Sequence, residues 1–177
     1  MIDSCGRMQW KLPEPMRLAL EEAQAAAHRG EVPVGAVVSD TGGRVLARAG
    51  NRTLELNDPT AHAELLAIRE AARLLGSERL VDCDLYVTLE PCAMCAMATL
   101  HARLERVVFA AADPKTGAAG SVVDLYAHRA LNHQTQIQGG VLADPCTELL
   151  RAFFARRRAE QRSERAQSIL PRDAPGT

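Results

Sequence analysis

At 177 residues and 47% apolar residues, the chain has the length of one globular domain rather than two. Its aromatic share of only 3% argues against a generic single-strand binder that stacks bases on aromatic rings. The formal net charge of -1 argues against a non-specific polyanion binder, although residues 151–177 hold 7 basic and 3 acidic residues.

Hydrophobic periodicity and turn residues predict alternating helices and strands. In chain order these are a helix at 14–29, strands at 32–40 and 44–50, a helix ending at Gly76, a strand at 84–89, a helix at 91–102, a strand at 106–111, a short helix at 122–126 and a last helix from about 144. Asp58 or Thr60 can cap the second helix, and Pro91 suits the first turn of the third. The alternation predicts a largely parallel central sheet covered by helices, and the hairpin makes that sheet mixed.

One domain is predicted at 14–160, with an N-terminal extension at 1–13 and a flexible tail at 161–177, which contains two prolines, a glycine and few apolar anchors. Neither a signal peptide nor a run of about 18 uncharged apolar residues is recognisable, so a cytoplasmic protein with no membrane segment is expected. Five cysteines without regular spacing do not indicate a disulfide framework.

Two short motifs combine residues that bind metals. HAE at 62–64 stands at the start of one predicted helix, and PCAMC at 91–95 stands at the start of another. Zinc binds imidazole nitrogen and thiolate sulfur, and three protein ligands leave its fourth tetrahedral position open to water, as in catalytic sites. His62, Cys92 and Cys95 are therefore predicted to hold one zinc ion.

The positions of these residues on helices support the same prediction. Cys92 and Cys95 are three residues apart, so both sulfurs lie on one side of a helical turn, and the positive end of the helix favours their deprotonated form. Glu64 is the candidate base that takes the proton of the metal-bound water and passes it to the substrate. This role requires Glu64 and His62 to straddle the start of the helix, because residues two apart on a regular helix point away from each other.

Plainer interpretations are available for the same residues. An arbitrary glutamate such as Glu64 is usually a solvent-facing residue of an amphipathic helix. A structural zinc site needs a fourth protein ligand, and neither Cys83 nor Cys146 has a suitable spacing. No role is assigned to the other cysteines and histidines, which are Cys5, Cys83, Cys146, His28, His101, His128 and His133.

Longer segments carry a family resemblance. The stretches EVPVGAVV, NDPTAHAE, LYVTLEPCAMC, RVVFAAADPKTGAAGS, GGVLAD and FFARRR closely resemble the bacterial tRNA-specific adenosine deaminases of the cytidine deaminase superfamily, over roughly residues 16–158. The resemblance implies a three-layer α/β/α fold with a mixed, mainly parallel five-stranded sheet, a homodimer, and one zinc ion per subunit. It also implies hydrolytic deamination of adenosine to inosine at the wobble position of a tRNA anticodon stem-loop, by zinc-bound hydroxide and a glutamate proton shuttle, a chemistry for which this class is an established example.

The resemblance also assigns roles to single residues. It implies zinc binding by His62, Cys92 and Cys95, proton transfer by Glu64, and a base-facing position for Asn51. It implies further substrate contacts in the loop after the fourth strand and in the last helix, at Asp113, Lys115, Thr116, Phe153, Phe154 and Arg157, and it places Arg156 and Arg158 on the same RNA-facing helix.

Two positions depart from the family pattern, and a plainer interpretation applies to the last helix. Met97 stands where a small residue is common, and Ala112 stands where a basic residue is common. The aromatic pair and the arginines of the last helix also fit a helix that packs its rings and solvates its charges.

Two alternative functions remain at this point. A deaminase of a free base or nucleoside, of the guanine or cytosine type, would use the same zinc centre. A catalytically silent zinc-binding module is the second alternative, and the intact Glu64 and the open ligand position argue against it.

Overall fold

The computed structural model describes residues 13–169. These residues form a mixed five-stranded sheet in the order β2-β1-β3-β4-β5. Its strands are β1 (Gly35–Asp40), β2 (Val45–Gly50), β3 (Cys83–Leu89), β4 (Arg106–Ala111) and β5 (Gln136–Gln138). β1 is antiparallel to both β2 and β3, whereas β3, β4 and β5 are mutually parallel. Four strands therefore run in one direction against β1, as expected for a mixed, mainly parallel sheet.

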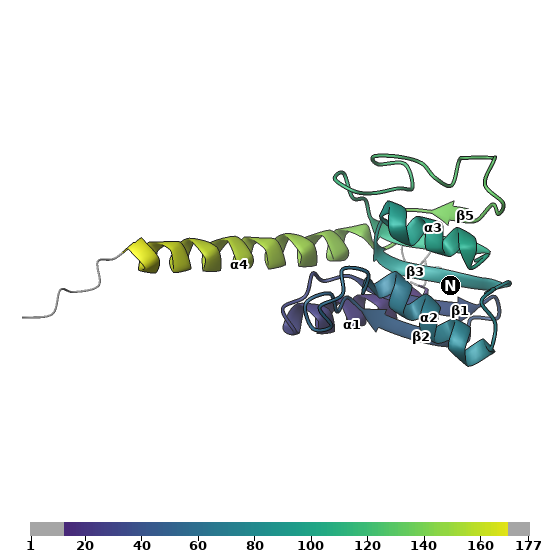
Figure 1. The fold of residues 1–177 in the computed structure, drawn as a ribbon, viewed down its shortest axis with the longest axis horizontal. Helices are drawn as coiled ribbons and strands as arrows, with labels where there is room; N and C mark the ends of the chain where they lie inside the picture. The colour runs from purple at the N-terminus through teal and green to yellow at the C-terminus, as the bar shows by residue number, and fades with distance from the viewer. Residues whose placement is uncertain (1–12, 170–177) are drawn as a thin grey trace, which may run out of the picture.

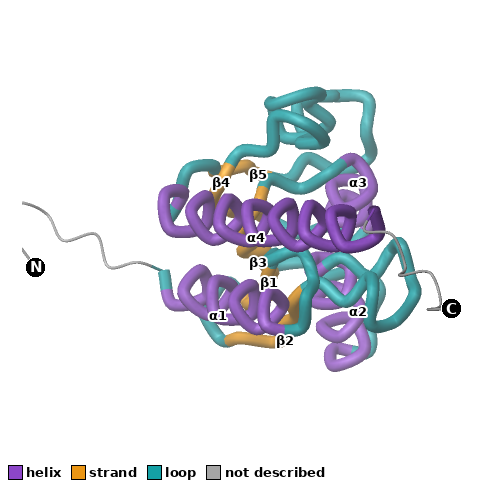
Figure 2. Tube along the Cα trace, turned by 90° about the vertical axis from the view of Figure 1, so that its left-hand side faces the viewer, coloured by secondary structure: helices purple, strands orange, loops and turns teal. Residues whose placement is uncertain are grey.

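Helices cover both faces of this sheet (Figures 1 and 2). The described residues contain α1 (Glu14–His28), α2 (Ala63–Leu75), α3 (Ala93–His101) and α4 (Ala143–Ile169). Val38 belongs to the core under α2 and α3, and its neighbour Val37 belongs to the core under α1 and α4. Successive residues of a strand point to opposite faces, so one strand serves both cores. The predicted three-layer α/β/α fold is confirmed.

The contact between α1 and the sheet depends on one glycine. A Cβ atom at Gly35 would lie 2.0 Å from the carbonyl oxygen of Ala19 and 2.5 Å from the nitrogen of Ala23. Both are backbone atoms of α1, which therefore approaches β1 more closely than any side chain at position 35 allows. This close approach determines how near α1, and with it the segment between α1 and β1, lies to the sheet.

Two predictions of local structure were wrong. α2 begins after His62 rather than after a cap at Asp58 or Thr60, and the carboxylate of Asp58 instead accepts a hydrogen bond from the backbone N–H of Thr60 at 2.7 Å. Residues 122–126 form turns and a bridge rather than a short helix. Their backbone is bonded to the preceding loop, for example from the N–H of Val122 to the carbonyl of Gly117. Tertiary hydrogen bonds have overridden the local pattern there.

The last helix is longer than predicted. α4 continues to Ile169, past residue 160, where the flexible tail was expected to begin. The added segment consists largely of Ala, Arg, Glu and Gln, which are strong helix formers, and the first proline after it is Pro171. Figure 1 shows that this part of α4 extends away from the rest of the molecule. The predicted N-terminal extension lies outside the described residues, apart from Pro13.

Candidate metal and active site

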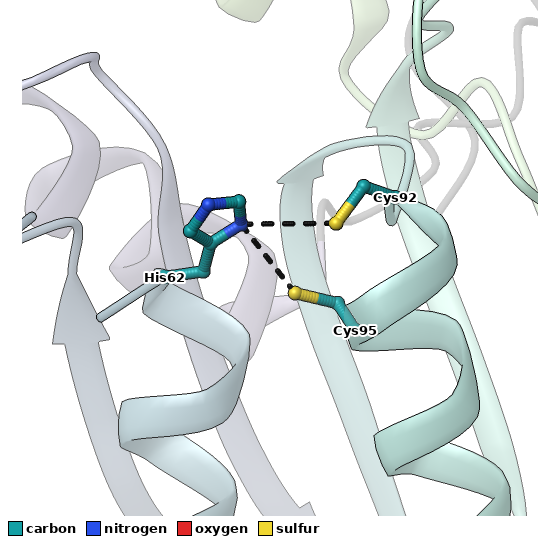
Figure 3. A group of neighbouring side chains, drawn as sticks. All are labelled: His62, Cys92 and Cys95. Carbon is teal, nitrogen blue, oxygen red and sulfur yellow. Dashed lines mark hydrogen bonds between the residues drawn. The ribbon is translucent and has the colours of Figure 1, made fainter. Parts of the chain in front are cut away.

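The site forms where two helices begin side by side. His62 is the residue that precedes α2, and Cys92 is the residue that precedes α3, both with extended backbone angles. Cys95 lies in the first turn of α3, and β3 delivers this turn through Glu90 and Pro91. Figure 3 shows the side chains of His62, Cys92 and Cys95, the predicted metal ligands, pointing toward one another from the two helix ends. The positive ends of both helices therefore face the same point.

The donor atoms of these residues have the spacing of a metal site. Nδ1 of His62 lies 3.8 Å from Sγ of Cys92 and 3.6 Å from Sγ of Cys95, and the three donor atoms lie within 4.8 Å of one another. Zinc–sulfur bonds of about 2.3 Å and zinc–nitrogen bonds of about 2.0 Å, at a tetrahedral angle, separate S and N by roughly 3.5 Å. The donor set and its spacing therefore fit a zinc ion.

The charges of the two sulfurs also suit a cation. A hydrogen bond from Cys95 lowers the pKa of the Cys92 thiol to about 4, against the opposing effect of burial. The pKa of Cys95 is raised, because its thiol donates that hydrogen bond and is buried. The hydrogen bond with Cys92 in turn raises the pKa of His62. Without a metal the two sulfurs thus share one proton, which a divalent cation can replace.

Glu64 lies beside this donor set, in the position relative to His62 that its predicted role requires. His62 stands outside α2 and Glu64 stands in its first turn, so the two residues straddle the helix start. The carboxyl group is 3% exposed, and burial raises its pKa. Its Oε2 atom has no hydrogen-bond partner among the described residues. A buried carboxylate oxygen without a partner is costly, which points to a ligand, a proton or a water as its partner during function.

The start of α2 is held by a side chain from a distant loop. Oδ1 of Asn51 accepts a hydrogen bond of 2.9 Å from the backbone N–H of Ala63, the first residue of the helix. This bond fixes the orientation of the Asn51 amide and leaves its NH₂ group available to the cavity that Asn51 lines. Asn51 therefore places the helix that carries His62 and Glu64, and also offers two donors to a bound molecule.

A cavity of about 710 Å³ opens in front of these residues. Its lining includes the apolar side chains of Val32, Val34, Leu89 and Ala111. The loop after β4 and α4 also line it and contribute polar and charged groups. Apolar walls with a few convergent polar groups are typical of sites that bind a flat organic ring.

The loop after β4 is anchored by Glu90. The carboxylate of Glu90 is buried and accepts hydrogen bonds from the backbone N–H groups of Asp113, Ala119 and Ser121 and from the hydroxyl of Ser121. A Cβ atom at Gly117 would lie 2.4 Å from the same carboxyl group, so only glycine allows the loop to pass this closely. Glu90 thus connects the wall of the cavity to the segment that carries Cys92.

Glu90→Gln is expected to lower the free energy of unfolding by about 1–3 kcal/mol at pH 7, because an amide cannot accept all of these bonds. Burial alone would raise the pKa of Glu90, but the bonds from Ser121, Asp113 and Ala119 outweigh it and lower the pKa. The carboxylate therefore stabilises the fold above its unfolded pKa of about 4.3, and this contribution is lost as the pH falls through the folded value. Urea unfolding of wild type and Glu90→Gln, at pH 7 and below pH 4, measures the difference in their free energies of unfolding. This difference should be smaller at the lower pH. The exposed Glu78→Gln is the control, and equal stability of both variants at pH 7 would contradict the expectation.

The structure separates the predicted substrate contacts into two groups. Asn51, Asp113, Lys115, Thr116 and Phe154 line the cavity together with Glu64 and two of the metal ligands. The carboxylate of Asp113 also accepts hydrogen bonds from the N–H groups of Lys115 and Thr116, so it shapes the turn that presents them.

The other predicted contacts lie elsewhere. Phe153 is 6% exposed and lies in a separate small cavity between α1 and α4, and Arg157 does not line the large cavity. Arg158, which the resemblance includes among the RNA-facing arginines of the last helix, does line it. Sequence reasoning missed Arg151, which also lines it, although its spacing with Phe154 and Arg158, at i, i+3 and i+7, is the helical periodicity that could have identified it. Of the two departures from the family pattern, Ala112 lines the cavity and Met97 packs against the core.

Comparisons with known proteins agree with this geometry. Residues 10–111 match the model of the cytidine and deoxycytidylate deaminase zinc-binding region. The chain is 50% identical to a tRNA-specific adenosine deaminase of Agrobacterium fabrum, over 82% of this chain and 95% of that protein. No helix within residues 13–169 is both long enough and apolar enough to span a membrane.

Two solved structures extend the comparison. One comes from work on A-to-I editing by tRNA:A34 deaminases at the wobble position of transfer RNA, with 50% identity, a TM-score of 0.74, and coverage of 77% of this chain and 98% of that chain. The other is the guanine deaminase of Bacillus subtilis, with 40% identity, a TM-score of 0.53, and coverage of 55% of this chain and 62% of that chain.

Proposed function

Because the chain belongs to the zinc-binding cytidine and deoxycytidylate deaminase family, and within it to the tRNA-specific adenosine deaminases, we propose that it deaminates adenosine to inosine at the wobble position of a tRNA anticodon. The reaction is a hydrolysis, in which the bond from C6 of the base to its amine breaks, a bond from C6 to oxygen forms, and ammonia leaves. The observation that carries the proposal is the buried carboxylate oxygen of Glu64 beside His62, Cys92 and Cys95, which has no hydrogen-bond partner within residues 13–169.

The residues of the site divide the work of this reaction. His62, Cys92 and Cys95 would hold a zinc ion, which when bound makes water a good nucleophile near neutral pH. Glu64 takes a proton from the attacking water, delivers it to a ring nitrogen of the base, and later assists protonation of the departing amine. The Asn51 NH₂ group, oriented by the bond between its Oδ1 and Ala63, donates to the base.

The remainder of the cavity supports a nucleotide within RNA rather than a free base. Val32, Val34 and Leu89 supply an apolar wall that excludes water from the base. Lys115, Arg151 and Arg158 line the same cavity. A free base has no phosphate for such groups to bind, whereas a nucleotide in an anticodon loop has one on each side. Asp113, Thr116 and Phe154 are proposed to contact the flanking nucleotides.

A deaminase of a free purine such as guanine is the second candidate, because the chain is also similar to a guanine deaminase. Incubation of zinc-loaded protein with an anticodon stem-loop that contains adenosine at the wobble position separates the two. Sequencing of the product should read inosine at that position, and free guanine and cytosine should be unchanged. Consumption of a free base with the stem-loop intact would reject the tRNA substrate and leave the metal chemistry in place.

We further propose the finer properties implied by the family. These are one zinc ion per subunit, a homodimer, a cytoplasmic location, and a deaminase domain at 14–160. Leu54, Leu56, Val122 and Val123 support the dimer, because they are large apolar side chains exposed on loops of the single subunit. The four cysteines of the described residues are all free, as expected in a reducing compartment. Light scattering of the purified protein tests the dimer.

A further inference from the structure

The segment between α1 and β1 contains a buried carboxylate that the proposed reaction does not use. Glu31 is 1% exposed, and it is neither one of the clustered metal donors nor part of the cavity lining. Its Oε1 atom accepts hydrogen bonds of 2.9 Å from the backbone N–H groups of Leu54 and Glu55, and its Oε2 atom accepts one of 3.1 Å from the hydroxyl of Thr53. A buried carboxylate is costly unless such bonds compensate it, so Glu31 and this part of the loop hold each other in place.

These bonds are important because other contacts hold this part of the loop after β2 only weakly. Residues 51–62 form turns and extended backbone rather than a helix or a strand. Leu54 is 62% exposed, so apolar packing within the subunit contributes little there. The ion pair between Arg29 and Glu55, at 3.5 Å, joins two groups that are each more than a third exposed and is therefore weak. Glu31 is thus the buried anchor of this loop.

Thr53 connects the anchor to the active site. It lines the cavity together with Asn51, and Val32 and Val34, which follow Glu31 in the chain, line it as well. The backbone N–H of Asn51 donates a hydrogen bond of 3.0 Å to the carbonyl of Val34, so the two segments lie side by side in the cavity wall. Glu31 therefore fixes the position of Thr53 relative to the rest of this wall.

The direction of the bond also decides what Thr53 can offer to a bound molecule. A hydroxyl group has one proton, and a carboxylate accepts hydrogen bonds but donates none. The proton of Thr53 therefore points to Glu31, and the lone pairs of its oxygen remain available to a donor in the cavity. An adenosine within RNA has two such donors, which are the base amine and the 2′-hydroxyl of the sugar.

We propose that Glu31 is a positioning residue that places Thr53 in the cavity wall and fixes its hydroxyl as a hydrogen-bond acceptor for the bound nucleotide. The inference rests on the proposed function and deepens it, because it adds Thr53 as a substrate contact and Glu31 as the residue that orients it. Asn51 keeps its own hydrogen bond to the start of α2, so the helix that carries the proton-transfer residue does not depend on Glu31. A change at Glu31 should therefore weaken substrate binding and leave the chemical step unchanged.

Glu31→Gln tests the orientation of the hydroxyl while the loop stays anchored. The amide oxygen of glutamine can still accept both backbone bonds, but the amide nitrogen donates, which reverses the bond to Thr53 and turns the threonine proton toward the cavity. On an anticodon stem-loop with adenosine at the wobble position, this variant should raise KM roughly tenfold, the size of one lost hydrogen bond. Its kcat and its zinc content should equal those of wild type, because the lost contact contributes to binding alone.

Thr53→Val makes the result specific to the hydroxyl, because valine has nearly the same shape and lacks that group. It should also raise KM roughly tenfold, and adding Glu31→Gln to it should raise KM no further, since the oriented hydroxyl is already absent. Asp84→Asn is the matched control, because the carboxylate of Asp84 is also buried, pairs with Arg106 and lies outside the cavity. The control should keep the KM of wild type even where its unfolding curve shows a loss of stability.

A second RNA identifies the donor on the substrate. We expect the sugar hydroxyl, because the base amine leaves from the carbon that is attacked at the metal site. On a stem-loop with 2′-deoxyadenosine at the wobble position, wild type and Thr53→Val should then have equal KM, whereas a persistent difference would assign the base amine as the donor to Thr53.

The outcomes separate this inference from the proposed function. Wild-type KM for both single variants on the adenosine stem-loop, or additive effects in the double variant, would overturn the roles of Glu31 and Thr53 and leave the deaminase intact. A wild-type protein that leaves the stem-loop unchanged would overturn the proposed function and these roles with it.

Discussion

Glu64→Gln is expected to lower kcat for deamination by about 10²–10⁴-fold, the usual contribution of a positioned acid–base group. Glutamine has nearly the same shape as glutamate but cannot accept and release a proton. Glu64 is not one of the three clustered metal donors, so the variant should bind as much zinc as wild type and remain folded. Single-turnover deamination of the stem-loop, with zinc measured by elemental analysis, checks both statements.

Glu70→Gln is the matched control, because Glu70 lies on the same helix and pairs with Arg73 at the surface. It should retain the kcat of wild type. Because Glu64 is buried, the unfolding curve of Glu64→Gln is recorded as well, and it should match that of wild type. Full activity of a zinc-loaded Glu64→Gln protein would exclude a proton-transfer role for this residue.

Cys95→Ala is expected to remove both the metal and the activity. Cys95 is fully buried and supplies one of the three clustered donors found among residues 13–169, so its loss should weaken zinc binding by more than the roughly 10–100-fold that follows loss of an outer-shell partner. Wild type should contain one zinc per chain, lose activity on exposure to a strong chelator, and regain it on addition of zinc. The variant should contain little zinc and should not be rescued.

Cys146→Ala is the control for this change, since it also removes a buried thiol. Cys146 lies near the start of α4 in the core on the other face of the sheet, and burial raises its pKa to about 11, so it stays a neutral thiol. Its alanine variant should keep zinc and activity, with only a small loss of stability. Retention of stoichiometric zinc by Cys95→Ala would show that the metal is held elsewhere.

Local signals were enough to predict most of the sheet and the metal donors. A continuous apolar run with β-branched and aromatic residues marked the strand Arg106–Ala111 with its correct bounds, because this signal lies within a few residues. The spacing of Cys92 and Cys95 indicated a shared ion because one helical turn determines both positions. β5 was missed because three residues of mixed polarity carry no periodicity, and their strand conformation comes from pairing with β4.

The sequence by itself thus determined the order of α1 to α4 and of β1 to β4 and the residue types of the predicted metal site, since both depend on residues close together in the chain. Only the tertiary structure decided where α2 begins, because the amide of Asn51 binds a helix N–H 12 residues away. It also decided how the loop after β4 is held, because Glu90 binds groups 23 to 31 residues away. It also decided which arginines of α4 face the cavity, since packing of Phe153 against the body sets the rotation of the helix. Contacts between distant residues leave no local pattern in a sequence, so these features had to be observed in the fold.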